Sequence, residues 1–443
     1  MQGNREEFGS SVAAVLALAG SAIGLGNIWR FPYIVGQHGG AAFIIVYFLF
    51  TILLSLPVFI CEATLGRNTH SNPLGAINKY APNSKWLILA AITIIGPLLI
   101  TSYYSVVGGW SLAYLVKSCF SSFGNLSQEE VGRMFTDFSS SVWRPVIAHS
   151  TFLLCTAVVI NAGVTKGIEK VSKIIMPVLF AIMVLLVIFS CTLPGAGAGL
   201  DYLLKPDFSK LDGPALAAAM GQSFFSLSLG MGTILTYGSY MKQSDNLVRA
   251  AGFTAVFDIA FALISGFFIM PAVFSVGLQP TAGPGLVFET LPYIFSNMGA
   301  SSALLSKVVT IAFFLAIVLA ALTSEMSMFE VCTAYLVEEK KLSRRRASIY
   351  VFGIAWAVGL FCVLFPRFFD MCDFAASNIF MTLGALGFVL FVGWKMKKAI
   401  VRDEITNNGS IKLNNKLFKV IYFLIRYVAP VGILLIFVFN FIS

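Results

Sequence analysis

Residues 20–27 read Gly-Ser-Ala-Ile-Gly-Leu-Gly-Asn, and residues 226–233 read Ser-Leu-Ser-Leu-Gly-Met-Gly-Thr. Each stretch places a closely spaced glycine pair, Gly24 and Gly26 or Gly230 and Gly232, in the middle of a long apolar segment, beside hydroxyl or amide side chains. Glycine tolerates the backbone angles of an unwound turn, and such a turn in hydrocarbon leaves N–H and C=O groups without partners. A bound ion and a polar ligand can satisfy those groups. The two stretches therefore predict two broken membrane helices.

The composition around these stretches is that of an integral membrane protein. Of the 443 residues, 58% are hydrophobic and 12% are charged. A soluble chain has about 25% charged and roughly 45–50% apolar residues. These values exclude a soluble enzyme, a disordered chain and a small disulfide-stapled module. The apolar runs are continuous rather than alternating, which disfavours a β-barrel and predicts an all-α membrane protein.

Eleven apolar segments are long enough to cross a bilayer, which takes about 20 residues. Their approximate bounds are 10–36, 41–66, 87–118, 144–161, 169–191, 215–240, 248–276, 304–336, 346–365, 370–396 and 418–441. The stretches near 123–143 and 280–300 are rich in Gly, Pro or Ser, and we expect loops there with short surface helices at most. The whole chain, 1–443, is expected to form a single transmembrane domain.

Lysine and arginine indicate how the chain crosses the membrane. The net charge is +9, and its basic clusters at 166–173, 340–346 and 395–419 fall on one side if the N-terminus is cytoplasmic. Positive charge concentrates in cytoplasmic loops. We therefore expect a cytoplasmic N-terminus and, after an odd number of spans, Ser443 outside. The charge is then a topology signal, so we expect a lipid bilayer around the chain, no nucleic acid as a partner, and no protein partner.

The two glycine-rich breaks open two halves of similar length. The first five segments span 10–191, the next five span 215–396, and 418–441 is an additional eleventh span. Matching interruptions in two halves of a membrane chain indicate a transporter's binding site. Close helix packing through small residues is the alternative explanation for Gly20 and Gly24. The matched pair of breaks favours the binding site.

Several polar residues lie at membrane depth, where a charge costs about 2.5–3.5 kcal/mol on insertion scales. Asp258 lies between Phe257 and Ile259, and a bound cation or a structural hydrogen bond would explain it. Glu62 could accept freed N–H groups of a broken helix, while Glu325 and Glu330 have no role that the sequence assigns. The seven cysteines have no regular spacing, so we interpret them as small packed residues rather than metal ligands.

Four motifs together resemble the neurotransmitter:sodium symporter family, and most closely its bacterial branch, typified by LeuT. They are residues 20–32 (GSAIGLGNIWRFP), 226–237 (SLSLGMGTILTY), 320–324 (AALTS) and 61–67 (CEATLGR). The resemblance implies a LeuT-like five-plus-five inverted repeat with broken helices one and six. It also implies sodium-coupled amino-acid uptake by alternating access, in the bacterial inner membrane. Ending after eleven spans is similar to several bacterial members.

The resemblance also implies residue roles, which we carry over by position. Sodium site one would use Ala22, Asn27, Ser226 and Asp258, and sodium site two would use Gly20, Ile23, Ala320, Thr323 and Ser324. The substrate pocket would be lined by Ser21, Ala22, Gly24, Gly26, Ile100, Tyr104, Phe225, Ser226, Ser228, Met231, Ser324 and Met328. The outer gate would comprise Phe225, Arg30 and Asp373, and the inner gate Arg5, Ser239, Tyr240 and Glu338.

Departures from the family pattern refine the expected substrate. Gly24 stands where amine transporters carry an Asp, which favours amino acids over monoamines. Asp258 would supply the negative charge that chloride gives the animal members, so no chloride requirement is expected. The lining residues Ile100, Phe225, Met231 and Met328 are apolar and suggest a hydrophobic substrate, aromatic ones included.

Other functions remain open at this point. When sodium and substrate leave, the Asp258 carboxylate would favour its protonated form in a low dielectric, so the empty carrier could return with a proton. A proton-coupled amino-acid carrier on the same scaffold is the alternative to sodium coupling. A channel or receptor could also use broken helices. An intramembrane enzyme is not expected, because the spans carry no nucleophile–base or paired-metal constellation.

Overall fold

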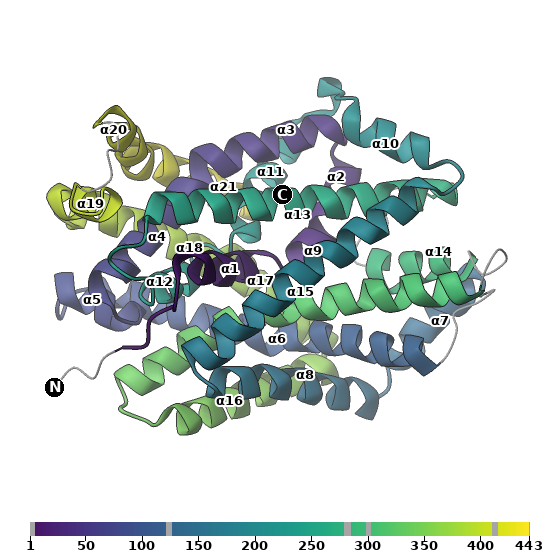
Figure 1. Ribbon diagram of the computed structural model, residues 1–443, viewed down its shortest axis with the longest axis horizontal. Helices are drawn as coiled ribbons and strands as arrows, with labels where there is room; N and C mark the ends of the chain where they lie inside the picture. The colour runs from purple at the N-terminus through teal and green to yellow at the C-terminus, as the bar shows by residue number, and fades with distance from the viewer. Residues whose placement is uncertain (1–4, 121–125, 279–284, 298–302, 410–414, 443) are drawn as a thin grey trace.

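A computed structural model describes residues 5–120, 126–278, 285–297, 303–409 and 415–442. Within these ranges, nine helices are long and apolar enough to cross a membrane. A bent pair makes a further span: α1 (Ser11–Ala22) is followed by η1 (Gly26–Arg30) and α2 (Phe31–Gln37) at an angle of 54°. Most helices run side by side along the long axis of the molecule (Figure 1).

The first half of the chain supplies the first five spans. After the bent pair come α3 (Ala41–Phe50), η2 (Thr51–Ser55), α4 (Leu56–Thr69), α5 (Pro73–Tyr80), α6 (Leu87–Phe120), α7 (Gln128–Ser139), α8 (Trp143–Asn161), η3 (Val164–Glu169), α9 (Lys170–Cys191), α10 (Ala196–Leu204) and η4 (Phe208–Lys210). The second span is continuous from Ala41 to Thr69, and the third is the longest of this half.

The second half repeats the pattern of a broken helix followed by long ones. It comprises α11 (Gly213–Ser226), α12 (Thr233–Gly238), α13 (Leu247–Ser275), η5 (Leu286–Thr290), α14 (Leu291–Asn297), α15 (Ala303–Glu338), α16 (Arg344–Leu364), α17 (Pro366–Phe374), η7 (Ala375–Phe380), α18 (Met381–Leu390) and η8 (Phe391–Lys395). Next follow α19 (Lys398–Ile405), α20 (Asn415–Phe423), η9 (Leu424–Val428) and α21 (Ala429–Ile442).

Both predicted breaks are present. The first lies at residues 23–25, between α1 and η1, and the second lies at residues 227–232, between α11 and α12. Polar caps fix where the flanking helices begin: the Ser10 side chain accepts from Ala13 N–H, and the Asp212 side chain accepts from Ala215 N–H. The sequence expectation of two interrupted helices is therefore confirmed.

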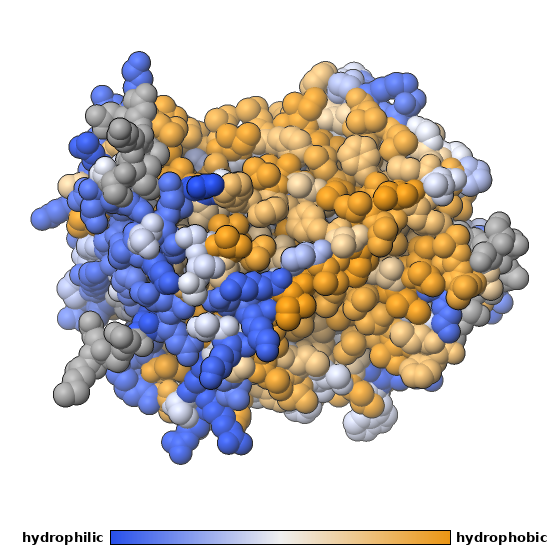
Figure 2. Space-filling model, viewed as in Figure 1, coloured by the Kyte–Doolittle hydropathy of each residue, from blue (hydrophilic) through white to orange (hydrophobic). Residues whose placement is uncertain are grey.

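Packing places the first break at the centre of the bundle. Helix α1 contacts α13, α15 and α9, and α6 packs along most of α15. Apolar side chains also cover the outside of the bundle, such as Leu185, Val158 and Ile349, each more than half exposed. Figure 2 shows this hydrophobic surface over the middle and right of the view, with hydrophilic residues at the left end, near α5 and α19. Such a surface suits a bilayer.

One expectation about the loops is wrong. The part of 280–300 that is described forms η5 and α14, and its side chains Phe288, Leu291 and Phe295 are at most 2% exposed. This segment is buried because its aromatic side chains pack against α15 residues such as Phe313. The segment around 123–143 contains α7, a mostly exposed helix capped by Ser127 and Glu130, as expected for a surface helix.

Candidate functional site

The first break leaves backbone groups that side chains of other elements satisfy. Leu25 N–H donates to the hydroxyl of Tyr104 at 3.0 Å, and Gly24 N–H donates to the amide oxygen of Asn27 at 3.2 Å. A methyl group on Gly24 would lie 2.8 Å from the Tyr104 hydroxyl and 3.0 Å from Ser324. Position 24 therefore has no room for a larger side chain in this arrangement.

The second break has three residues in the left-handed region. Ser228, Gly230 and Gly232 have φ of 53°, 80° and 67°. The Gly230 N–H donates to Oε1 of Glu62 at 2.7 Å, the structural role that the sequence suggested for this acid. A methyl group on Gly230 would lie 1.9 Å from the Met381 carbonyl oxygen, and one on Gly384 would lie 1.9 Å from the Gly230 carbonyl oxygen. The break is thus pressed directly onto α18.

The two breaks contact each other. The Ser228 hydroxyl donates to the Ser21 carbonyl oxygen at 2.9 Å, and the Ser324 hydroxyl donates to the same oxygen at 3.3 Å. The Ser21 hydroxyl in turn donates to Ser327 Oγ at 2.8 Å. One carbonyl at the end of α1 is therefore the meeting point of α1, the second break and α15.

Asp258 is the centre of a buried cluster of polar groups. Asn27 Nδ2 donates to Asp258 Oδ1 at 2.7 Å, and the Ser226 hydroxyl lies 2.8 Å from both Asp258 carboxylate oxygens. Asn27 Nδ2 also donates to Ser226 Oγ at 3.1 Å. All three side chains are at most 1% exposed. The structure therefore brings together Asn27, Ser226 and Asp258, with Ala22 a few residues away at the end of α1.

Two polar residues at or near this cluster escaped the sequence analysis. The Tyr47 hydroxyl lies 3.2 Å from Ser226 Oγ and 3.2 Å from Asp258 Oδ2. Gln222 donates through Nε2 to the Gly26 carbonyl oxygen at 3.2 Å. Gln222 is a polar residue one turn before Ser226 in an apolar helix, and this position could have identified it as a candidate site residue. Tyr47 gives no comparable signal, because it stands among ordinary apolar span residues.

A second group of oxygen atoms lies where α1 meets α15. Gly20 faces Thr323, whose Cβ would be 3.3 Å from a methyl group on the glycine. The Thr323 hydroxyl contacts the carbonyl oxygens of Leu319 and Ala320 at 3.2 and 3.1 Å. Ile23 and Ala320 are fully buried. Of the residues predicted for the second sodium site, Gly20 and Thr323 therefore face each other across α1 and α15.

The apolar lining residues belong to a single packed cluster. Ile100, Tyr104, Met231 and Met328 are at most 7% exposed and pack in it, and the half-buried Phe225 lies against it. A methyl group on Gly26 would lie 2.8 Å from the Phe225 ring, so this ring covers Gly26. Beside this cluster, Glu325 is fully buried, and neither of its carboxylate oxygens has a hydrogen-bond partner among the described residues.

A cavity of about 710 Å³ opens above Phe225. Its lining includes Arg30, Tyr104, Phe225 and Asp373. The Arg30 guanidinium lies over the Phe225 ring, 4.6 Å from its centroid. Among the described residues, no ion pair within 4 Å joins Arg30 to Asp373. The predicted outer-gate residues thus surround one cavity without closing it.

The opposite end of the bundle is closed by charged pairs. Arg5 forms an ion pair with Glu338 at 2.7 Å, and its guanidinium lies 4.7 Å from the centroid of the Tyr240 ring. Tyr240 donates to Glu330 at 2.6 Å, and Arg344 forms an ion pair with Glu330 at 2.6 Å. Glu330, which the sequence left without a role, therefore belongs here. Ser239 lies one residue away, and its carbonyl oxygen contacts the His70 ring at 3.2 Å.

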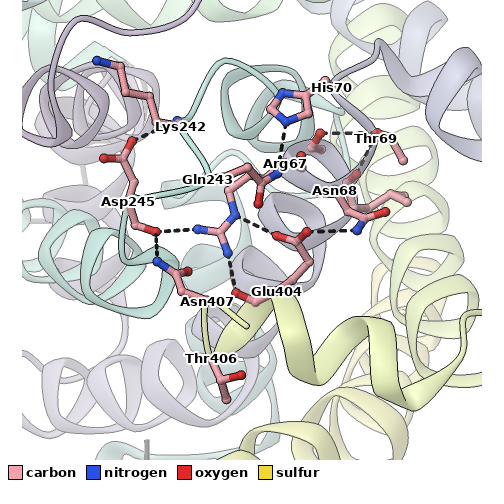
Figure 3. A network of polar contacts seen from close by, with 12 residues as sticks. Arg67, Asn68, Thr69, His70, Lys242, Gln243, Asp245, Glu404, Thr406 and Asn407 are labelled. Atoms are coloured by element: carbon pink, nitrogen blue, oxygen red, sulfur yellow. Dashed lines mark hydrogen bonds and ion pairs between the residues drawn. The ribbon is translucent and has the colours of Figure 1, made fainter. Parts of the chain in front are cut away.

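A further network at the same end is centred on Arg67 (Figure 3). Its guanidinium donates to Oε2 of Glu404 at 2.8 Å and to the Asp245 carbonyl oxygen at 2.5 Å. It also donates to the Glu404 carbonyl oxygen. Asn407 donates to the Asp245 carbonyl oxygen at 2.9 Å, and the Asp245 side chain accepts from Ser11. The network ties the end of α4 to α19, to the loop before α13 and to the start of α1.

A protein-family model and two bacterial relatives match almost the whole chain. The model of the sodium:neurotransmitter symporter family matches residues 5–135 and 140–443. The chain belongs to this family. It is 37% identical to the sodium-dependent transporter YhdH of Bacillus subtilis, over 97% of this chain and 96% of YhdH. It is 31% identical to a sodium-dependent transporter of Haemophilus influenzae, over 98% of each chain.

The fold agrees with that of a solved family structure. MhsT in complex with L-phenylalanine is 38% identical, covers 98% of this chain and 99% of its own, and superposes with a TM-score of 0.89. The chain is therefore a multi-pass membrane protein with the LeuT-like fold. As a symporter of this family it is a sodium-coupled secondary transporter of a small molecule and not an enzyme.

Proposed function

We propose that this symporter carries a hydrophobic amino acid, aromatic ones included, into the cell with sodium by alternating access. The meeting of the two broken helices at the Ser21 carbonyl carries this proposal. Backbone groups at such breaks can bind an amino acid's ammonium and carboxylate groups, and the adjacent apolar cluster can bind its side chain. The MhsT complex with L-phenylalanine supports the same substrate class.

Two sodium ions would enter as cargo. Oxygen atoms of Ala22, Asn27, Ser226 and Asp258 would bind the first, with the substrate carboxylate completing the shell. Those of Gly20, Ile23, Ala320, Thr323 and Ser324 would bind the second. Oxygen ligands suit a hard cation. Direct contact between the first ion and the substrate would make each bind more tightly in the presence of the other, which is what coupling requires.

The pocket chemistry favours an amino acid over a monoamine. Gly24 lies against the Tyr104 hydroxyl and Ser324, and it offers no acid of its own for a substrate ammonium group. A substrate that brings its own carboxylate would bind the Tyr104 hydroxyl and the first sodium. Phe225 would cover the substrate from the side of the large cavity, with Arg30 and Asp373 beyond it.

Chloride would not be required. The Asp258 carboxylate accepts hydrogen bonds from Asn27, Ser226 and Tyr47, so a negative charge of the protein itself would lie beside the first ion whenever sodium is bound. A bound chloride ion would only duplicate the negative charge that Asp258 provides at this place.

The closed end of the bundle would be cytoplasmic. Arg5, Ser239, Tyr240 and Glu338 would separate when the bundle of the first, second, sixth and seventh spans rocks. The protein would lie in a bacterial inner membrane, with its N-terminus inside and its C-terminus outside. Labelling of tags at the two termini in intact cells tests this orientation.

Uptake into proteoliposomes tests the transport function. Labelled leucine, tryptophan, tyrosine, alanine and glutamate would be offered in sodium or potassium, with and without chloride. We expect uptake of the bulky apolar members that needs sodium and ignores chloride. Equal uptake in both cations would replace the proposal with proton coupling on the same scaffold. A strict chloride requirement would contradict the role given to Asp258.

The return step would carry a proton on Asp258. Substrate-driven alkalinisation of the proteoliposome lumen should then accompany uptake and should vanish in Asp258→Asn. An unchanged internal pH in the wild-type protein during rapid uptake would contradict proton counter-transport and leave sodium coupling standing.

A further inference from the structure

Arg426 is a charged residue inside the last membrane span. It lies in η9, within a span that runs from Lys416 to Phe439. Its Nε is buried without a hydrogen-bond partner among the described residues, and none of their carboxylates lies within 4 Å of the guanidinium. A charge within a span is costly unless it is paired, so an arginine without a protein counter-ion indicates a ligand.

Two aromatic rings hold the guanidinium in place. Its carbon lies 4.4 Å from the centroid of the Trp394 ring and 5.6 Å from that of the Tyr427 ring. The two rings meet edge to face, with centroids 5.7 Å apart. A guanidinium that rests on a ring has a fixed plane, and the N–H donors along its edge stay available to a ligand. Both rings are exposed, so this site opens to the outside of the bundle.

The backbone fixes Arg426 against Trp394. Both residues lie in π-helical turns, Trp394 in η8 and Arg426 in η9. The turns pack closely, because a methyl group on Gly393 would lie 3.3 Å from the Arg426 Cα. Trp394 Nε1 donates to the Arg426 carbonyl oxygen at 3.1 Å. The usual helix donor to this oxygen is missing, since the residue four positions on is Pro430, which has no N–H.

Lysines beside the rings make the site attractive to an anion. Lys395 directly follows Trp394, and Lys398 Nζ lies 5.2 Å from the centroid of the Tyr422 ring. The Tyr422 hydroxyl in turn donates to the Gly393 carbonyl oxygen at 3.1 Å. Figure 1 places α19 and α20 at the end of the bundle where the N-terminus lies, which is cytoplasmic in the proposed orientation. Anionic lipids give the cytoplasmic leaflet a negative surface that attracts such basic residues.

An apolar stripe continues from Tyr427 along α21. Val431, Leu434 and Val438 follow it at spacings of four, three and four residues, which places all four side chains on one face of the helix. These side chains are roughly half exposed. The acyl chains of a lipid whose headgroup lies at Arg426 can pack along this stripe.

We propose that Arg426, held on the rings of Trp394 and Tyr427, binds the phosphodiester group of an anionic phospholipid. The edge of the guanidinium donates two parallel N–H bonds to two phosphate oxygens, the geometry that arginine favours for this group. Lys395 and Lys398 add positive charge, which disfavours a headgroup that carries its own cation, such as choline. The apolar stripe favours a lipid over free phosphate. This site is separate from the proposed transport function.

Native mass spectrometry of the purified full chain tests the binding. Dioleoyl phosphatidylglycerol and dioleoyl phosphatidylcholine are titrated separately. The first phosphatidylglycerol should bind at least about tenfold more tightly, and Arg426→Gln should remove this preference. Arg249→Gln is the matched control, because it removes an exposed arginine that lies on a single ring, 5.4 Å from the centroid of Phe253. Equal binding of the two lipids, or an equal loss in both variants, would overturn the proposal.

Two substitutions of Trp394 test the ring. Trp394→Phe keeps a ring under the guanidinium and should retain most of the preference, whereas Trp394→Leu should lose several-fold in affinity for phosphatidylglycerol. Equal affinities in these two variants would exclude the ring from the site.

A measurement on the wild-type protein decides the matter if Arg426→Gln does not fold. Amide hydrogen exchange at residues 391–395 and 424–428 should be slower in phosphatidylglycerol nanodiscs than in phosphatidylcholine ones, and equal exchange would contradict the proposal. Displacement of the lipid by an equal concentration of inorganic phosphate would reduce the site to a general anion site. A lipid-free dimer that Trp394→Leu dissociates would assign this face to a second copy of the chain instead.

Discussion

Arg67 and Glu404 form an ion pair with almost no access to solvent: Nε lies 2.8 Å from Oε2, and the side chains are 0% and 8% exposed. Removing one partner of a buried pair leaves an uncompensated charge, which costs about 3–5 kcal/mol. We expect Glu404→Gln and Arg67→Met each to destabilise the protein by this amount. The double variant should lose less than the sum, because no buried charge remains. Thermal unfolding in detergent measures all three.

An exposed pair provides the control for this prediction. Glu129 and Arg133 lie 2.6 Å apart on the surface of α7, with side chains 74% and 72% exposed. Since such pairs contribute about 0–1 kcal/mol, Glu129→Gln should leave the unfolding temperature nearly unchanged. Equal losses at Glu404 and Glu129 would mean that burial of the Arg67 network contributes nothing.

Tyr47→Phe should weaken sodium binding without unfolding the protein. The substitution keeps the ring and removes one donor to the Asp258 carboxylate. Loss of a hydrogen bond to a charged group costs about 1.5–3 kcal/mol. The sodium concentration for half-maximal uptake should therefore rise by roughly 10- to 100-fold. Tyr80→Phe, which removes a hydroxyl bonded to Asn68 far from the site, is the matched control. An unshifted sodium dependence in Tyr47→Phe would exclude this hydroxyl from the ion site.

Two substitutions at Ser228 separate backbone strain from side-chain bonding. Both Ser228→Ala and Ser228→Gly remove the hydroxyl that donates to Ser21. Only glycine adopts the φ of 53° at this position without cost, and an L residue pays about 1–2 kcal/mol there. We expect both variants to lose uptake and Ser228→Gly to be the more stable by about that amount. Equal unfolding temperatures would show that the angle changes freely.

Gly26→Ala should displace the ring of Phe225. The added methyl group would lie 2.8 Å from the ring, closer than carbon atoms approach. We expect an uptake rate lowered by at least about tenfold, since misplacement by an ångström near a site has effects of this size. Phe225→Leu in the same chain should restore part of the loss by making room. If Phe225→Leu restores none of the uptake rate, the loss in Gly26→Ala comes from the backbone of the first break and not from the displaced ring.

The sequence predicted the features that depend on residues close together in the chain. The paired glycines beside polar residues predict the two breaks. The apolar helices also contain a few conspicuous polar residues, namely Asn27, Ser226 and Asp258. Their meeting in one buried cluster is what the structure adds. How each binds sodium or substrate stays a prediction.

The parts that escaped prediction depend on contacts between distant segments. Tyr47 looks like any aromatic residue of a membrane span until α3 is placed beside α11. Glu330 gains a role only when Arg344 approaches it from α16 and Tyr240 approaches it from the turn after α12. Likewise α14 looked like a loop, because its glycine- and proline-rich flanks concealed a buried aromatic face.

The contact of Gly230 with Gly384 has a consequence for how this chain can vary. Because backbone atoms of Met381 and Ala385 in α18 occupy the volume where a Cβ of residue 230 would be, and the Gly230 carbonyl group occupies the volume where a Cβ of residue 384 would be, both positions select against size alone, without regard to charge or polarity. In a saturation-mutagenesis library selected for growth on the substrate, only glycine should therefore be recovered at these two positions. At Ser228, by contrast, substitutes should lose growth in an order set by the hydrogen bond that they keep to the Ser21 carbonyl oxygen rather than by size alone. The boundary between positions of these two kinds would map the contact between the second break and α18.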